Sequence, residues 1–280
     1  MENDQKLKDL VKEKYSEIAL QDKATNQSSC CGAAGCSTEV YNIMSEDYSK
    51  LAGYQEAADL GLGCGLPTEF ANIKAGDTVI DLGSGAGNDC FIARKEVGEN
   101  GEVIGIDFTP AMIDKAKANA EKLGFANVSF RHGDIEYIPV SANKADVVVS
   151  NCVLNLVPNK AGVFTEIYRV LKPGGHFSIS DIVLEGILPD ALKEAAEMYA
   201  GCVAGAIQKQ SYLQLIEKAG FKAIVIQKDK PILIPADILD KYLSPDEMAQ
   251  FDGGAKVISS ITVYGEKPGD STCCTPDCCN

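Results

Sequence analysis

The chain has 280 residues, 45% of them hydrophobic, and a formal net charge of −14. This length allows a sizeable core, arranged as one large domain or two smaller ones. The acidic charge argues against nucleic-acid partners, which need a basic patch, and against anionic membrane surfaces, and it is easier to reconcile with a neutral or cationic small substrate.

The N-terminus and the lack of long apolar runs indicate a cytoplasmic protein. The first ten residues are charged and lack the apolar stretch of a secretory signal, and no apolar run reaches the length of a membrane span. Eleven cysteines are many for a reducing compartment. In that setting they indicate metal ligands or redox-active thiols more than structural disulfides.

The predicted elements begin with an amphipathic helix over residues 3–20. A small, polar segment over residues 21–38 follows, which we expect to be a mobile loop, and it carries Cys30, Cys31 and Cys36. Residues 39–74 are mixed in character and include a glycine-rich run at 61–65 that contains Cys64.

From residue 76 onward, short apolar strands alternate with helices. We expect strands over residues 78–82, 103–107, 128–131, 146–150, 176–183, 221–226 and 257–264. We expect helices over residues 88–97, 110–123, 160–171, 189–200 and 211–219, and from residue 236. This alternation predicts an α/β, Rossmann-like fold with a mostly parallel seven-stranded sheet and helices on both faces.

We divide the chain into four parts on this pattern. Residues 1–70 form an N-terminal helical cap, and residues 71–230 form the Rossmann-like domain, with an insertion around 184–210. Residues 231–266 contain a C-terminal helix and the final strand. Residues 267–280 form a flexible tail, which we place outside the core because it is polar and contains Cys273, Cys274, Cys278 and Cys279.

The strongest motif is the glycine-rich turn GSGAG at residues 83–87, directly after the first predicted strand. Glycines let the backbone approach a ligand closely, and the following helix N-terminus offers unpaired N–H groups to an anion. The spacing differs from the G-x-G-x-x-G of dinucleotide sites. A dinucleotide is therefore the weaker choice. With the acidic residues described next, the turn resembles the class I SAM-dependent methyltransferases over roughly residues 70–230, and in S-adenosylmethionine (SAM) the anion would be the methionine carboxylate.

Acidic residues at the ends of the next strands complete the predicted cofactor site. Asp107 ends the second strand, where a carboxylate can accept hydrogen bonds from both ribose hydroxyls. Asp134 follows the third strand, where it can contact the adenine amino group. The full predicted set consists of Asp81, Gly83, Ser84, Gly85, Gly87, Asp107, Phe108, Met112, Gly133, Asp134, Ile135 and Asn151.

Three cysteines are candidates for holding the methyl acceptor. Cys152 follows the fourth strand and so lies at the carboxyl edge of the sheet, Cys64 lies in a segment whose glycines would let it fold over the site, and Cys202 lies between two predicted helices. Each alone is better explained as a small buried residue. Together they indicate a soft ion such as trivalent arsenic, which prefers thiolate ligands and keeps a lone pair to attack the methyl group.

Four strings sharpen this interpretation: GCG at 63–65, DLGSG at 81–85, SNCV at 150–153 and NLVP at 155–158. They resemble those of the arsenite SAM methyltransferases, and the similarity covers most of residues 1–220. The resemblance implies that Cys64, Cys152 and Cys202 bind As(III). It also implies that an N-terminal cysteine forms a disulfide with Cys64 during turnover, which thioredoxin or glutathione reduces. Cys30, Cys31 and Cys36 all match that position, and we favour the first two.

Two alternatives stay open. A SAM methyltransferase for a small organic acceptor, such as a quinone or sterol, would keep the glycine turn and Asp107 without needing the three cysteines. A non-catalytic protein that binds arsenic or another soft metal would use cysteines without binding SAM. The paired cysteines near the two ends of the chain could capture arsenic or its thiol conjugates, or be adventitious thiols. They lack the C-x-x-C spacing of zinc sites.

Overall fold

The computed structural model describes residues 2–21, 46–187, 189, 205–233, 243–244, 246 and 257–269. Several sequence predictions therefore lie outside the described residues: the segment from 22 to 38, most of the helix at 189–200 and the helix from 236. The same is true of eight cysteines, which are Cys30, Cys31, Cys36, Cys202, Cys273, Cys274, Cys278 and Cys279.

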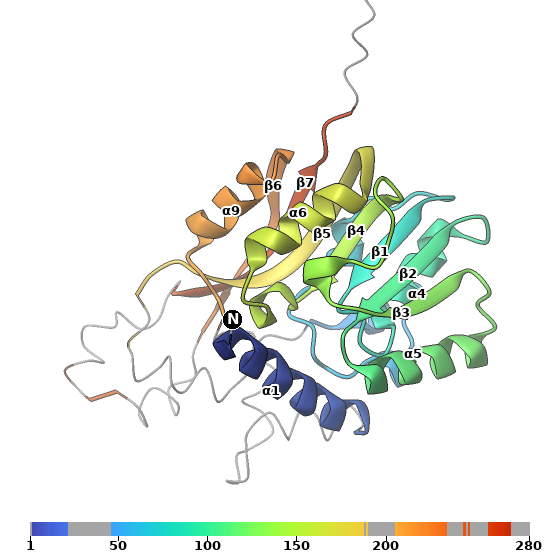
Figure 1. The fold of residues 1–280 in the computed structure, drawn as a ribbon, viewed down its shortest axis with the longest axis horizontal. Coiled ribbons are helices and arrows are strands. Elements are labelled where there is room, and N and C mark those ends of the chain that lie inside the picture. Colours follow the sequence, from blue (N-terminus) through green and yellow to red (C-terminus); the bar gives the residue numbers. More distant parts are fainter. Residues whose placement is uncertain are drawn as a thin grey trace, which may run out of the picture.

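The described residues form a seven-stranded sheet with strand order β3-β2-β1-β4-β5-β7-β6 (Figure 1). Strand β7 is antiparallel to both of its neighbours, and the other paired strands are parallel. The predicted α/β, mostly parallel sheet is confirmed. The strands are β1 (Thr78–Leu82), β2 (Glu102–Asp107), β3 (Val128–His132), β4 (Ala145–Asn151), β5 (Leu171–Leu184), β6 (Lys222–Ile232) and β7 (Ile258–Glu266).

Helices pack on both faces of the sheet because successive strand residues point to opposite sides. Val79 of β1 belongs to the core cluster that contains residues of α4 (Asn88–Val97) and α5 (Pro110–Leu123). Its neighbour Ile80 belongs to the cluster that contains residues of α6 (Lys160–Val170) and α9 (Lys209–Lys218). Two separate hydrophobic layers therefore fix the sheet, and its strand ends are held in place from both sides.

Two strands are longer than predicted. Strand β5 begins at Leu171 and not at residue 176. In this added part the pairing with β4 shifts register, and Gly174 has a positive φ of 80°. Strand β6 continues to Ile232 past the polar run at 227–230, because its backbone pairs with β7 along that length. The ends of these strands are set by pairing with other strands. The local pattern of apolar residues does not reveal such pairing.

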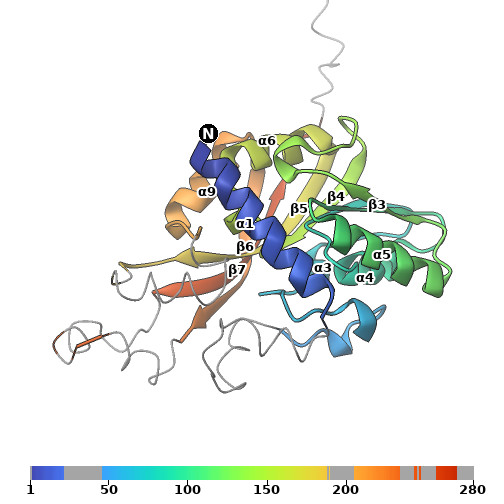
Figure 2. The same ribbon diagram turned by 60° about the horizontal axis from the view of Figure 1, so that its bottom comes forward.

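The N-terminal helix α1 (Glu2–Ala19) crosses the edge of the sheet and packs against α5 (Figure 2). It buries Val11, Ile18 and Ala19. The Lys115 Nζ donates hydrogen bonds to the carbonyl oxygens of Ala19 (2.9 Å) and Gln21 (3.1 Å), which closes the C-terminal end of the helix. The predicted helix over 3–20 is confirmed. The four-part division of the chain stays a prediction.

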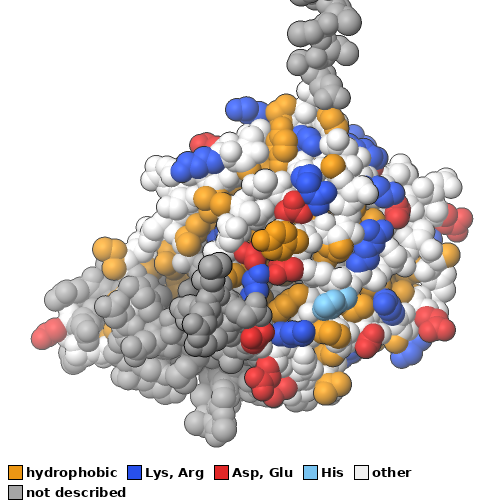
Figure 3. Space-filling model, in the orientation of Figure 1, with side chains coloured by type: hydrophobic (Ala, Val, Ile, Leu, Met, Phe, Trp, Pro, Cys, Tyr) orange, Lys and Arg blue, Asp and Glu red, His pale blue; other side chains and the backbone are white. Residues whose placement is uncertain are grey.

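The described surface carries charges of both signs. On the face in Figure 3, lysine and arginine side chains are interspersed with aspartate and glutamate over the described part of the chain. None of the helices in the described ranges is both long enough and apolar enough to cross a membrane.

Candidate functional site

A cleft opens at the carboxyl edge of the sheet, where the strand order reverses between β1 and β4. Open α/β sheets bind ligands at such a switch point. The glycine turn after β1 lines one wall of the cleft, and the segment after β4, which begins with Cys152, lines another. Lys8 and Tyr15 of α1 line it as well, so the N-terminal helix covers part of the cleft.

Most of the predicted cofactor residues line this cleft. They are Gly83, Ser84, Gly85, Asp107, Phe108, Met112, Asp134, Ile135 and Asn151. Three others do not lie on its wall. Asp81 is buried and accepts a hydrogen bond from the Cys90 thiol at 3.2 Å. Gly87 leaves room for the ring of Phe91, and Gly133 leaves room for Pro139. We interpret these three as residues that shape the turns.

The glycine turn lies directly against the cysteine-bearing segment after β4. Gly83 has a φ of +72°, and a Cβ placed on it would lie 2.2 Å from Cγ2 of Val153. Only glycine fits there without strain. A Cβ on Gly85 would meet no atom within 4 Å, because this residue faces open space in the cleft. The turn is thus packed on one side and open toward a ligand on the other.

Unpaired polar groups gather where the turn meets α4. The helix begins at Asn88 with Gly87 as its N-cap, and no side chain caps its free N–H groups. Within the described part of the chain, the buried Oγ of Ser84 and Oδ1 of Asn88 have no hydrogen-bond partner. Buried polar groups without partners are rare and call for a ligand or water. This set fits the carboxylate and ammonium groups of a bound amino-acid moiety, such as the methionine part of SAM.

Asp107 is held rigidly at the end of β2. Its Oδ2 accepts a hydrogen bond from the Gly85 N–H at 3.0 Å, and its Oδ1 accepts one from the Thr109 N–H at 2.8 Å. Burial raises the pKa of the Asp107 carboxyl above its ordinary value, while these N–H donors lower it. A carboxylate fixed in this way, facing the cleft, suits the recognition of ribose hydroxyls.

Asp134 is already engaged by the N-terminal helix. Its Oδ2 lies 2.6 Å from the Lys8 Nζ, and its Oδ1 accepts a hydrogen bond from the Glu136 N–H at 2.9 Å. Glu136 also pairs with Lys8. This ion pair could not be predicted from the sequence, because no local pattern connects α1 with the segment after β3.

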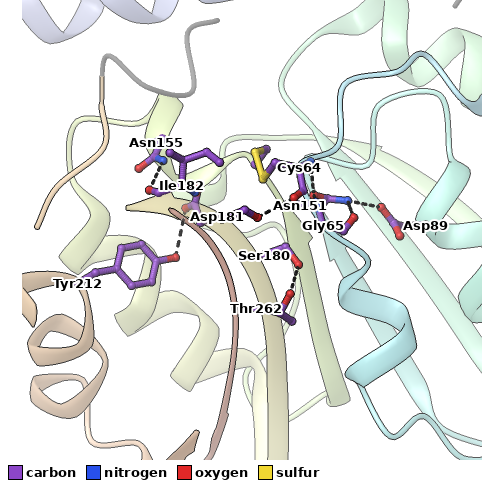
Figure 4. The surroundings of a disulfide bond; sticks show 12 residues. Cys64, Gly65, Asp89, Asn151, Asn155, Ser180, Asp181, Ile182, Tyr212 and Thr262 are labelled. Atoms are coloured by element: carbon purple, nitrogen blue, oxygen red, sulfur yellow. Dashed lines mark hydrogen bonds between the residues drawn. A yellow bond between two sulfur atoms is a disulfide. The ribbon is translucent and has the colours of Figure 1, made fainter. Parts of the chain in front are cut away.

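Cys64 and Cys152 meet beside the cleft and are joined by a disulfide (Figure 4). Their Cα atoms are 5.8 Å apart although 88 residues separate them in sequence. The resemblance implied a turnover disulfide between Cys64 and an N-terminal cysteine, whereas here Cys64 pairs with Cys152. Cys202 and the N-terminal candidates lie outside the described residues. Cys90 is a free, buried cysteine on α4.

The segment that follows Cys202 enters the described structure close to the disulfide. A Cβ on Gly205 would lie 1.8 Å from the Asn155 carbonyl oxygen, so the two backbones are in direct contact. Asn155 follows Cys152 by three residues, and Cys202 precedes Gly205 by three.

Several residues of the cleft wall were not predicted from the sequence, among them Tyr48, Asp59 and Asp89. Asp89 is 9% exposed, and burial raises the pKa of its carboxyl to about 6. Asp89 could have been predicted, because it lies in the first turn of the helix after the glycine motif, next to the expected ligand site. Tyr48 and Asp59 come from the cap region, where no strand or helix periodicity indicated which side chains turn inward.

Comparison with known proteins agrees with this geometry. Residues 73–220, more than half of the chain, match a family model described as a methyltransferase domain. An arsenite methyltransferase from Halobacterium salinarum is 41% identical over 274 residues, covering 93% of this chain and 66% of that relative. One from Aquipseudomonas alcaligenes is 34% identical over 240 residues, covering 83% and 67%.

A solved structure supports the same relationship. The arsenic(III) S-adenosylmethionine methyltransferase from Chlamydomonas reinhardtii superimposes with a TM-score of 0.60 at 33% identity, covering 74% of this chain and 67% of that one. The chain spans about two thirds of the length of these relatives. The glycine turn at the switch point, the matched domain and these relatives together show that the chain belongs to the arsenite methyltransferases, within the SAM-dependent methyltransferase family.

Proposed function

We propose that this chain methylates trivalent arsenic with SAM as the methyl donor, and that thiolates of Cys64, Cys152 and Cys202 hold the arsenic. One observation carries the proposal: Cys64 and Cys152, far apart in sequence, meet beside the cleft. Cys152 lies on the segment against which the glycine turn packs. A generic methyltransferase needs the turn, but it has no need of a pair of sulfurs at this position.

The residues around the turn would hold SAM. The free N–H groups of α4, with Ser84 and Asn88, suit its methionine end, and Asp107 suits its ribose. Bound there, SAM supplies an electrophilic methyl group. Because Gly83 contacts Val153, the residue after Cys152, SAM bound at the glycine turn would lie close to Cys152. Such proximity of donor and acceptor provides much of the rate in a group transfer.

The thiols of Cys64 and Cys152 are close enough to bind one ion once their disulfide is reduced. Soft ions such as As(III) select thiolate ligands, and three thiolates leave the arsenic lone pair available. Cys202 is three residues from the contact between Gly205 and Asn155, which supports its inclusion as the third ligand. No side-chain base is needed to create the nucleophile.

The disulfide supports a redox step that completes the cycle. When the arsenic lone pair forms the new carbon bond, the formal oxidation state of arsenic rises from three to five. Two thiolates that join as a disulfide return two electrons and restore As(III). We infer that Cys64 and Cys152 make this bond. A thiol reductant such as thioredoxin or glutathione then reopens it by exchange, with Cys30, Cys31 or Cys36 as relay candidates, and a cytoplasmic location would supply that reductant.

The test is to incubate the purified full chain with arsenite, SAM and reduced glutathione and to separate the arsenic species by chromatography with mass detection. We expect methylated arsenic, and we expect it to disappear when Cys64, Cys152 or Cys202 is replaced by serine. Cys90→Ser is the matched control, because serine keeps the hydrogen bond to Asp81. Its product yield should equal that of the natural chain.

The alternatives predict different results in the same assay. A methyltransferase for a small organic acceptor would bind SAM and produce no methylated arsenic. A non-catalytic arsenic-binding protein would bind arsenite and fail to bind SAM in calorimetry. Either outcome refutes the proposed function.

A further inference from the structure

The backbone of Cys64 and Gly65 is held by side chains and not by a helix or strand. The N–H groups of Cys64 and Gly65 donate to Oδ1 of Asn151 at 3.1 and 3.3 Å. The Gly65 carbonyl oxygen accepts from Nδ2 of Asn151 at 2.9 Å (Figure 4). It also accepts from the Tyr48 hydroxyl at 2.9 Å. The Cys64 carbonyl oxygen accepts from the Ser260 hydroxyl at 2.6 Å. Every polar backbone group of these two residues is therefore paired.

We call Tyr48, Asn151 and Ser260 the backbone clamp. They come from η1 (Tyr48–Lys50), from the last residue of β4 and from β7, so three distant segments converge on one peptide. Asn151 makes three of the five contacts. It also directly precedes Cys152 in the chain. The dipeptide Asn151-Cys152 therefore carries one sulfur of the disulfide and binds the backbone of Cys64, which carries the other sulfur.

The clamp also explains the glycines that flank Cys64. A Cβ on Gly63 would lie 2.8 Å from both Nδ2 of Asn151 and the Tyr48 hydroxyl, and a Cβ on Gly65 would lie 2.4 Å from the Ser180 hydroxyl. Larger residues would push the loop away from the side chains that bind it. The GCG string thus permits close approach between this loop and the side chains around it.

The hydrogen-bonding capacity of Asn151 is fully used within the protein. Its Oδ1 accepts two N–H donors, and its two amide hydrogens face three acceptors, which are Gly65 O, the Tyr48 hydroxyl and Oδ2 of Asp89 at 3.3 Å. This leaves Asn151 without spare capacity for a direct bond to a cofactor, although it lines the cleft. The role in cofactor binding that the sequence suggested for Asn151 is less well supported than a role in holding Cys64.

We propose that Asn151 is a positioning residue that fixes the Cys64 sulfur opposite Cys152 by binding the backbone of Cys64 and Gly65. A loop without the clamp would sample many positions, and the effective concentration of one thiol at the other would fall. The significance for arsenic rests on the proposed function, since an ordered dithiol is what As(III) would bind. The geometric claim itself concerns only the two sulfurs.

The test measures how readily the two thiols join. Each reduced protein is equilibrated with defined ratios of oxidised and reduced glutathione, the free thiols are alkylated, and the Cys64–Cys152 disulfide is quantified by peptide mass spectrometry. Asn151→Ala should lower the equilibrium constant for this disulfide by about tenfold or more, given the several hydrogen bonds lost. Tyr48→Phe removes one clamp hydroxyl and should lower it by about fivefold.

Asn127→Ala is the matched control, because Asn127 also binds two backbone carbonyl oxygens, those of Gly98 and Gly101, away from the cleft. It should change the constant by less than about twofold. SAM affinity, measured by calorimetry, should change little in the Asn151 variant. Weakened SAM binding with an unaltered disulfide equilibrium would overturn the proposal.

Circular dichroism identifies the variants that fold. If Asn151→Ala does not fold, Tyr48→Phe decides, and an unaltered equilibrium in that variant overturns the proposal. A natural chain that forms the disulfide as expected but methylates no arsenite would refute the proposed function while leaving the clamp intact. The two failures are therefore distinguishable.

Discussion

Replacing Gly83 by alanine tests the contact between the glycine turn and the cysteine-bearing segment. The φ of Gly83 is +72°, in the left-handed region, and a new Cβ would lie 2.2 and 2.7 Å from the two γ carbons of Val153. Alanine therefore introduces two separate problems, a strained backbone and a steric overlap. The overlap pushes on the residue next to Cys152.

The two contributions can be estimated separately. A left-handed alanine costs about 1–2 kcal/mol, and overpacking of a tight contact costs about 1–3 kcal/mol. Gly83→Ala should thus lower the free energy of unfolding by about 2–5 kcal/mol. Gly124, the C-cap of α5, has a similar φ of +68°, and a Cβ added to it would meet no atom within 4 Å. Gly124→Ala should cost only the backbone contribution, about 1–2 kcal/mol.

Urea unfolding followed by circular dichroism would measure these differences. The double variant Gly83→Ala with Val153→Ala removes both γ carbons and should recover most of the steric part. The coupling energy between the two sites should then be at least about 1 kcal/mol. Equal losses in Gly83→Ala and Gly124→Ala, or strict additivity in the double variant, would refute the argument that the turn and the cysteine segment are in tight contact.

Three further predictions concern single side chains. Asp107→Asn should weaken SAM binding by about 10- to 100-fold in calorimetry, since hydrogen bonds to a charged group contribute about 1.5–3 kcal/mol. Asp181 is fully buried, and burial raises the pKa of its carboxyl from 3.8 to about 7. The folded state therefore binds the proton more tightly, so this group's contribution to stability falls as pH rises from about 4 to 7. We therefore expect the difference in free energy of unfolding, Asp181→Asn minus natural chain, to be more favourable to the variant at pH 8 than at pH 5. Urea unfolding at the two pH values measures this difference. Lys8→Gln removes the ion pairs with Asp134 and Glu136, and limited proteolysis should then cleave α1 faster, with high salt reducing the difference.

Local pattern was sufficient for much of the fold. The bounds of β1, α4 and α5 match the predicted ones, because apolar runs are interrupted there by glycine or by a proline at the start of a helix. The limits of β5 and β6 were wrong because Leu171 pairs with Ala145 of β4, which moves the start of β5 forward, and because β6 pairs with β7 as far as Ile232. A strand's length is decided partly by its partner, which a single window of sequence does not contain.

The candidate site divides in the same way. Asp107 and Cys152 could be placed from sequence because the carboxyl ends of parallel strands meet at one edge. The ion pair of Lys8 and the inward side chain of Tyr48 could not, since they depend on how the cap region lies over that edge. The pairing of Cys64 with Cys152 is likewise a tertiary contact. The sequence thus predicts which side chains lie at the ends of strands. It does not predict which side chains from distant segments contact them.

Three consecutive residues at the end of β4, Asn151, Cys152 and Val153, link the glycine turn to the sulfurs. Asn151 binds the backbone of Cys64, Cys152 bonds to its sulfur, and Val153 packs against Gly83. An extended strand would send successive side chains to opposite faces, and Cys152 breaks this alternation with a φ of +59°. A non-glycine residue in that region costs about 1–3 kcal/mol and persists only where its surroundings enforce it. The disulfide, the clamp and the Gly83 contact are such surroundings, so the bend at Cys152 is the geometric condition that brings the glycine turn and the two sulfurs together at one edge of the sheet.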